Sequence, residues 1–207
     1  MRYATFKEQK ITEIMKSKGI LTVQDLHIDN VCEVFKIDLI FHPRRCNCIN
    51  EDEDDYAVIF VDNRLPYQEQ RYKFFHELSH VLFHPGNQKE MTSEMEQLQE
   101  NQARWITLYS SMPRHIFEPM AIRYQSIEKL QELFDLPQQY IIERFQTIQR
   151  ERLRQQFQNR LKRSEMSRRK KSLQPGLVYD STLSILNQLK KQVGEDKLNY
   201  DVKRLLR

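Results

Sequence analysis

The sequence predicts an α+β protein that is mostly helical, with a small β-sheet and a helical, basic C-terminal extension. Apolar residues recur at the three- and four-residue spacing of amphipathic helices along most of the chain. The 207 residues include only four glycines, and 30% are charged, which is typical of a helix-rich and well-solvated protein. The clearest strand is predicted at Tyr56–Asp62, a run of aromatic and β-branched residues.

The N-terminal elements follow from apolar spacing and from residues that end helices. Residues 5–18 are expected to form an amphipathic helix that Gly19 ends. Thr22 is expected to cap a second helix that runs to about Phe35. The apolar run 37–41 is expected to be a short strand that His42 and Pro43 stop.

The next segment is expected to be a loop, followed by a long helix. Residues 44–55 are predicted to be a loop that ends in the acidic run 51–55, which could bind a cation but is expected to be solvated. A turn at 63–66 leads into the long helix, which Pro85 and Gly86 end.

Four further helices are expected before residue 148. They are predicted at 94–111 with Ser93 as its cap, at 113–122, at 126–134 with Ser126 as its cap, and at 137–145. The first of them carries apolar residues at helical spacing, which we expect to be core rather than binding surface. These residues are Met95, Leu98, Trp105 and Leu108.

The character of the chain changes near residue 148. We expect one domain at 1–148 and a basic helical extension at 149–207, whose last helix, ended by Gly194, is capped by Asp180 or Ser181. The basic stretch Arg150–Lys171 has two interpretations. It can be an exposed arm or a docking surface for a partner, or it can contact DNA phosphates without reading sequence.

The sequence also indicates the cellular compartment of the protein. No run of eighteen apolar residues is present, so no membrane span is predicted. The N-terminus lacks the apolar core of a signal peptide, and the cysteines lack disulfide spacing. Cys46 and Cys48 could join a metal site, but we expect them and Cys32 to be ordinary reduced thiols. The sequence therefore predicts a cytoplasmic protein.

Residues 76–80 read HELSH, an HExxH pattern inside a nearly all-apolar helical segment. His76 and His80 are four residues apart, so on an α-helix both imidazoles can reach one ion. Imidazoles at this spacing suit zinc, and Glu77 can reach a water molecule at the ion. Short motifs also arise by chance, but two histidines and a glutamate in apolar surroundings are costly without partners. We therefore expect a zincin-like helix.

A zinc enzyme needs a third protein ligand and an open position. His84 lies on the same helix face as His76 but about 12 Å away along the axis, because each residue rises about 1.5 Å. We therefore expect His84 to support the site or end the helix rather than bind the ion. Carboxylates of the following helix are the alternative, and spacing does not choose among them. They are Glu90, Glu94, Glu96 and Glu100.

The stretch from Tyr56 to Pro113 resembles the ImmA/IrrE metallopeptidases. That family shows a strand, a Leu-Pro turn, an Arg-aromatic pair, HELxHxxxH, and then E-x-x-A-x-x-F/I-A ahead of Met-Pro. This chain has RYKFFHELSHVLFH followed by LQENQARWITLYSSMP, and the resemblance covers roughly residues 20–145. Its E-x-x-A begins at Glu100, and Gln102 stands where many members have a second Glu.

The resemblance implies a zinc site made of His76, His80 and Glu100. It implies that zinc acts as a Lewis acid on a peptide carbonyl, while Glu77 takes a proton from water and hands it to the leaving amine. An oxyanion stabiliser is also expected. Nearby candidates, each expected to be structural, are Tyr72, Tyr109 and Arg104.

The resemblance also implies a biological role. Such proteases are commonly encoded on phages and integrative elements, where they cleave a helix-turn-helix repressor. We therefore expect a zinc-dependent regulatory endopeptidase with a partner protein as substrate. The alternative is a non-catalytic antirepressor or DNA-associated regulator that keeps the metallopeptidase fold.

Overall fold

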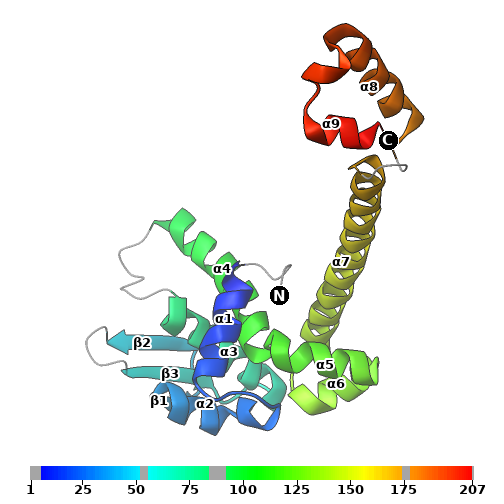
Figure 1. Ribbon diagram of the computed structural model, residues 1–207. Coiled ribbons are helices and arrows are strands. Elements are labelled where there is room, and N and C mark those ends of the chain that lie inside the picture. Colours follow the sequence, from blue (N-terminus) through cyan, green and yellow to red (C-terminus); the bar gives the residue numbers. More distant parts are fainter. Residues whose placement is uncertain (1–5, 52–55, 84–91, 174–177, 207) are drawn as a thin grey trace. The chain divides into compact units, whose positions relative to one another are not determined.

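The protein is described by a computed structural model that covers residues 6–51, 56–83, 92–173 and 178–206. Its contacts divide the chain into two compact units, Met1–Arg150 and Glu151–Arg207. Most described residues are helical, and the described strands form one small sheet (Figure 1). The predicted α+β class is therefore confirmed in its mostly helical character and its small sheet. Separate folding of 1–148 and 149–207 stays a prediction.

The sheet has the strand order β1–β3–β2. The central strand β3 (Tyr56–Asp62) pairs parallel with β1 (Ile37–His42) and antiparallel with β2 (Asn47–Glu51). Alternate residues of β3 are buried, because successive side chains of a strand point to opposite faces. These buried residues are Ala57, Ile59 and Val61.

Strand β2 corrects the prediction of a loop at 44–55. Its sequence NCINE is polar, and it is an edge strand whose register is set by pairing of Asn47 with Phe60 and of Glu51 with Tyr56. Pairing of this kind is a contact between distant residues, which local composition does not reveal. Residues 52–55, most of the acidic run, lie outside the described residues.

The first helix, α1 (Phe6–Ser17), ends near the predicted residue. Gly19 follows with a φ of 79°, the left-handed conformation that glycine adopts without a steric penalty. Ile11 and Met15 are fully buried, whereas Phe6, the first residue of the helix, is 80% exposed.

The second helix was predicted to start after Thr22, and this was wrong. The carboxylate of Asp25 accepts hydrogen bonds from the backbone N–H of Thr22 and from its hydroxyl, so that hydroxyl does not cap a helix. A short 3₁₀ turn, η1 (Gln24–Leu26), forms first, and α2 (Ile28–Phe35) follows it. The acidic side chain thus competes with the helix for the local donors.

Helix α3 (Tyr67–Phe83) carries residues 76–80 and packs against β2, β3 and α4. Phe74, Phe75 and Leu78 are fully buried, as their apolar character predicts. The helix begins after the expected turn. His84 and the predicted helix-ending pair Pro85 and Gly86 lie outside the described residues.

Helix α4 (Ser93–Ser111) differs from the prediction at its N-terminal half. Its cap is Thr92, whose hydroxyl accepts from the Met95 N–H, rather than Ser93. Of the four predicted core residues only Leu108 is buried, since Met95, Leu98 and Trp105 are 54%, 58% and 44% exposed. The buried residues of α4 begin at Ala103, because only the second half of the helix enters the core.

Two short helices complete the cover of the hydrophobic core, and a long helix extends beyond it. In α6 (Ile127–Phe134) the predicted cap is confirmed, since the Ser126 hydroxyl accepts from the Lys129 N–H at 3.2 Å. It follows α5 (Arg114–Tyr124). The helix predicted at 137–145 is longer than expected: α7 (Gln138–Leu173) runs on through residue 148.

The second unit also contains α8 (Asp180–Val193) and α9 (Tyr200–Leu205). The range predicted for the last helix fits α8, but its N-cap is Tyr179 without a side-chain cap, so the predicted caps were wrong. Helix α9 was not predicted. Among the described helices, none is long and apolar enough to cross a membrane.

A buried ionic group joins α1, α5 and α7 in the first unit. Glu8, which is 1% exposed, accepts from Arg144 at 2.6 Å and pairs with Arg114 at 3.5 Å. Arg144 is also 1% exposed and donates to the Met112 carbonyl at 3.2 Å. The apolar core surrounds these groups. Its largest fully buried apolar side chains are Phe74, Phe75, Phe117, Phe134, Ile11, Met15, Ile20, Leu26, Ile59, Leu78 and Ile106.

Removal of the Glu8 carboxylate is expected to destabilise the first unit strongly. Glu8→Ala should lower the free energy of unfolding by about 3–5 kcal/mol, because the Arg144 guanidinium loses its carboxylate in a buried position. Urea unfolding followed by circular dichroism measures the change. Glu13→Ala, at an exposed position of the same helix, should stay within about 0.5 kcal/mol of the parent. Equal losses in both variants would contradict this account.

Candidate metal centre

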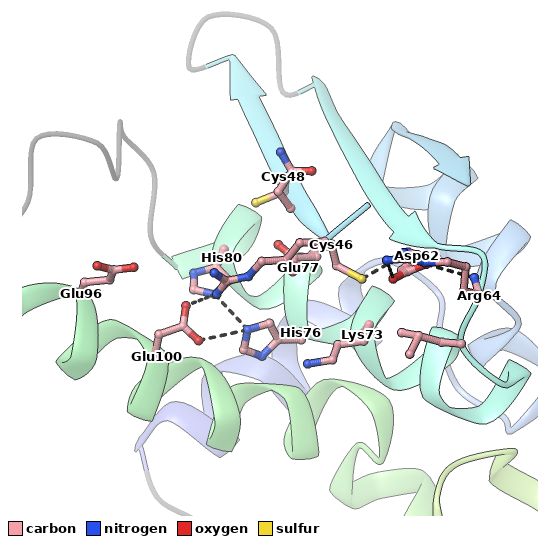
Figure 2. Close-up of a pocket in the computed structure, with 13 residues that line it drawn as sticks. Cys46, Cys48, Asp62, Arg64, Lys73, His76, Glu77, His80, Glu96 and Glu100 are labelled. Carbon is pink, nitrogen blue, oxygen red and sulfur yellow. Dashed lines mark hydrogen bonds and ion pairs between the residues drawn. The ribbon is translucent and has the colours of Figure 1, made fainter. Parts of the chain in front are cut away.

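Two helices bring three metal-binding side chains together. Helix α3 supplies His76 and His80 from successive turns, and α4 supplies Glu100 (Figure 2). Within the part of the chain that the structure describes, these residues form the one group of three or more such side chains whose ligand atoms could hold a metal ion, all within 4.8 Å of one another. The structure therefore brings together the three predicted ligands.

The distances within this group fit a tetrahedral metal ion. The two Nε2 atoms lie 3.3 Å apart, and the Glu100 carboxylate oxygens lie 3.3 Å from His76 Nε2 and 3.4 Å from His80 Nε2. Zinc binds nitrogen and oxygen at about 2.0–2.1 Å, so neighbouring ligands of a tetrahedral ion are about 3.3 Å apart. Two imidazoles and a carboxylate are also a known donor set for catalytic zinc. The residues present therefore fit the ion.

The position of Glu100 depends on how α4 is anchored just beyond it. Gln102 accepts a hydrogen bond from Lys7 of α1 at 2.6 Å, and Arg104 pairs with Glu143 of α7 at 3.1 Å. Gln102 thus faces α1. These contacts, with the fully buried Ala103, fix the helix at the residue where it enters the core.

Electrostatics distinguishes the two glutamates of the site. Hydrogen bonds from His76 and His80 hold the pKa of Glu100 well below its usual range. Burial raises the pKa of Glu77, and the neighbouring histidines oppose that shift in part. The Glu77 side chain lies in the cleft beside the histidines without being one of the three grouped ligands.

Cys48, which the sequence indicated as a possible metal ligand, also lines the cleft. Burial raises the pKa of its thiol to about 12, and the Glu77 carboxylate adds to the shift. Cys46 also lines the cleft, and its sulfur accepts from the Asp62 N–H at 3.3 Å. All three cysteines are free thiols, as predicted.

The site opens into a cleft of about 740 Å³ between β2, β3, α3 and α4. Its basic lining residues are Arg45, Arg64 and Lys73. Arg64 is engaged by the Asp62 carboxylate at 2.7 Å. Helical spacing could have identified Lys73, since it lies three residues before His76 and so on the same face of α3. Arg45 was not identified, because it lies in the segment before the unpredicted strand β2; Cys46 and Cys48 were considered as metal ligands but not as neighbours of Glu77.

The other residues considered from the sequence lie elsewhere. Glu96 lines the cleft one turn before Glu100, whereas Glu94 is exposed outside the ligand group. Glu90 falls outside the described residues. The three oxyanion candidates have structural partners. Tyr72 stacks on Tyr140 with ring centroids 3.6 Å apart, Tyr109 lies under Arg144, and Arg104 pairs with Glu143.

Comparison with known proteins points to one family. The model of the IrrE N-terminal-like domain, an M78 peptidase domain, matches residues 32–159, more than half of the chain. The chain is also similar to the phage-like element PBSX protein XkdA of Bacillus subtilis (strain 168). The two are 24% identical over 203 residues, which span 97% of this chain and 96% of that protein.

Metal binding is expected to depend on each of the three converging side chains. Purified protein supplied with zinc should retain about one zinc per chain, and His76→Ala, His80→Ala and Glu100→Ala should each lose most of it, because a catalytic-type site has only three protein ligands. Elemental analysis after gel filtration measures the content. Glu96→Ala is the matched control, since this carboxylate lines the same cleft on the same helix, and it should keep its zinc. Zinc retained by Glu100→Ala would contradict the assignment of α4 to the site.

Proposed function

We propose that this chain, which belongs to the IrrE N-terminal-like family of M78 peptidases, is a zinc-dependent endopeptidase that cleaves a partner protein. The family match confirms the resemblance to ImmA/IrrE proteins that the motifs indicated. The observation that carries the proposal is the convergence of His76, His80 and Glu100 in an open cleft that also holds Glu77. A family match to a peptidase domain supports the reaction class.

His76, His80 and Glu100 would hold the zinc ion. When bound, zinc supplies Lewis acidity, which polarises a peptide carbonyl and lowers the pKa of a water molecule. The His76 and His80 side chains are only 17% and 4% exposed, so little water surrounds two of the three ligands. The more exposed Glu100, at 44%, faces the open side of the site. This asymmetry leaves room for a substrate on the side of α4.

Glu77 has the position required of a general base. It lies three residues before His80 on α3, and its carboxylate lines the cleft beside the two histidines. There it would accept a proton from water and donate that proton to the leaving amine of the cleaved peptide. Both of these roles of Glu77 are proton transfers.

Lys73 is the residue of this chain best placed to stabilise negative charge. It lies on α3 one turn before Glu77 and lines the cleft. An ammonium group there would stabilise the charge that develops on the carbonyl oxygen. The tyrosines and the arginine considered from the sequence are held by other partners, as described above.

The proposed substrate is a helix-turn-helix repressor of a phage or mobile element. The family resemblance suggests this substrate class, and the similar B. subtilis protein belongs, by its name, to a phage-like element. A repressor acts on DNA in the cytoplasm, so the peptidase would act there too. The alternative is a binding protein that keeps the metallopeptidase fold and acts as an antirepressor or DNA-associated regulator without cleavage.

Replacement of the proposed base separates these two functions. Glu77→Gln should lower cleavage of the co-expressed repressor of the same element at least about 100-fold, because the amide cannot accept the proton from water. Mass spectrometry of the repressor measures cleavage, and zinc content shows that the site is intact.

Glu69→Gln, near the start of the same helix, is the control and should cleave as the parent does. Relief of repression by Glu77→Gln at the parent level, without repressor fragments, would overturn the peptidase proposal in favour of the binding protein.

A further inference from the structure

Helix α7 exposes an apolar stripe in its part within the second unit. Leu153, Phe157 and Leu161 are 65%, 63% and 48% exposed. They are spaced by four residues, so at about 100° per residue they fall within an arc of about 80° on one side of the helix. Exposed apolar side chains aligned in this way, rather than scattered singly, mark interaction surfaces. We call these three residues the α7 stripe.

Basic residues border the α7 stripe on both sides. At the same angular spacing, Arg154 lies about 20° beyond one edge of the stripe and Arg160 about 20° beyond the other. Both are exposed. Residues 151–167 contain five basic residues and only two acidic ones, Glu151 and Glu165. The surface therefore combines an apolar centre with positively charged borders.

We propose that the α7 stripe binds an amphipathic helix of a partner protein that has an apolar face bordered by acidic residues. Leucine and phenylalanine at this spacing pack against the apolar face of an incoming helix. Glutamate or aspartate at the borders of that helix pairs with Arg154 and Arg160, which fixes the choice of partner and speeds association. The proposal goes beyond the peptidase function and does not depend on catalysis.

A second copy of the chain fits this surface less well. In an antiparallel pair of α7 helices centred on Phe157, two-fold symmetry puts Arg154 of both copies on one border of the contact and Arg160 of both copies on the other. Each border then carries two like charges, which disfavour the pair. A partner with acidic borders removes this repulsion.

Duplex DNA also fits the surface less well. Phosphate contacts would use the basic residues of α7, but three of the five in 151–167 lie on the side away from the α7 stripe, so such contacts leave its apolar side chains uncovered. Phe157 is the one aromatic residue in 151–167, too few for a platform of stacked bases. The apolar centre thus favours a protein helix over a nucleic acid.

The test uses the full chain with Glu77→Gln, so that a peptide probe is not cut. The probe is a fluorescein-labelled 21-residue synthetic helix with leucine on one face and glutamate at both borders. A peptide of the same composition in scrambled order controls for charge alone. Fluorescence anisotropy measures binding at 0.1 M and 0.3 M salt, with a 30-base-pair duplex as competing ligand and analytical ultracentrifugation for self-association.

The matched variants come from the same helix. Leu153→Ser with Phe157→Ser should weaken binding of the probe by about tenfold or more. Met166→Ser is the control, because Met166 is 66% exposed and lies on the opposite side of α7, and it should leave binding unchanged. Arg154→Glu with Arg160→Glu should also weaken binding, whereas Lys162→Glu, on the far side, should have a smaller effect.

Selective binding of the ordered probe with this pattern supports the proposal. Equal binding of the scrambled peptide, or no binding of either, overturns it. Tight duplex binding that the serine substitutions leave unchanged also overturns it and assigns the surface to nucleic acid. A dimer that Phe157→Ser dissociates overturns it in favour of a second copy.

Discussion

The approach of α4 to α3 is the constraint on which the site depends. Two imidazoles one turn apart can come from any helix with the right spacing, but the carboxylate of Glu100 must reach them from a separate helix within 3.4 Å. That helix is exposed before Glu100 and buried from Ala103, so the ligand lies where α4 enters the core. Contacts with α1 and α7 at Gln102 and Arg104 hold it there.

The buried Glu8 group joins α1 and α7, the two helices that contact α4, to α5. Its carboxylate accepts from Arg144 of α7 and pairs with Arg114 of α5, so three helices share one set of charges. A buried ion pair adds little net stability compared with a well-packed apolar core, but removal of one partner is costly. We infer that the group acts mainly on specificity: it allows one arrangement of α1 against α7, and therefore one position for α4.

The sequence predicted the elements whose signal is local. The helical spacing of α1, α3 and α6, the β-branched run of β3 and the Ser126 cap are all set by neighbouring residues. The sequence failed where distant contacts decide: β2 forms by pairing with β3, and Met95 and Leu98 have core-like spacing but are exposed. Within the site, spacing gave the histidines and left Glu100 open among four carboxylates. The family resemblance, rather than physical reasoning, selected it. The sequence named Cys48 only as a possible metal ligand, and its position in the cleft was not predicted because its strand was not.

The central claim is that the ion is held by two imidazoles and the Glu100 carboxylate, with the nearby thiols outside the ligand set. X-ray absorption spectroscopy at the zinc edge tests this most directly, because zinc–sulfur bonds of about 2.3 Å are distinct from nitrogen and oxygen bonds of about 2.0–2.1 Å. The account predicts only nitrogen and oxygen neighbours, with the multiple-scattering signature of two imidazoles. A sulfur neighbour that disappears in Cys48→Ser would contradict it, since β2 rather than α4 would then complete the site.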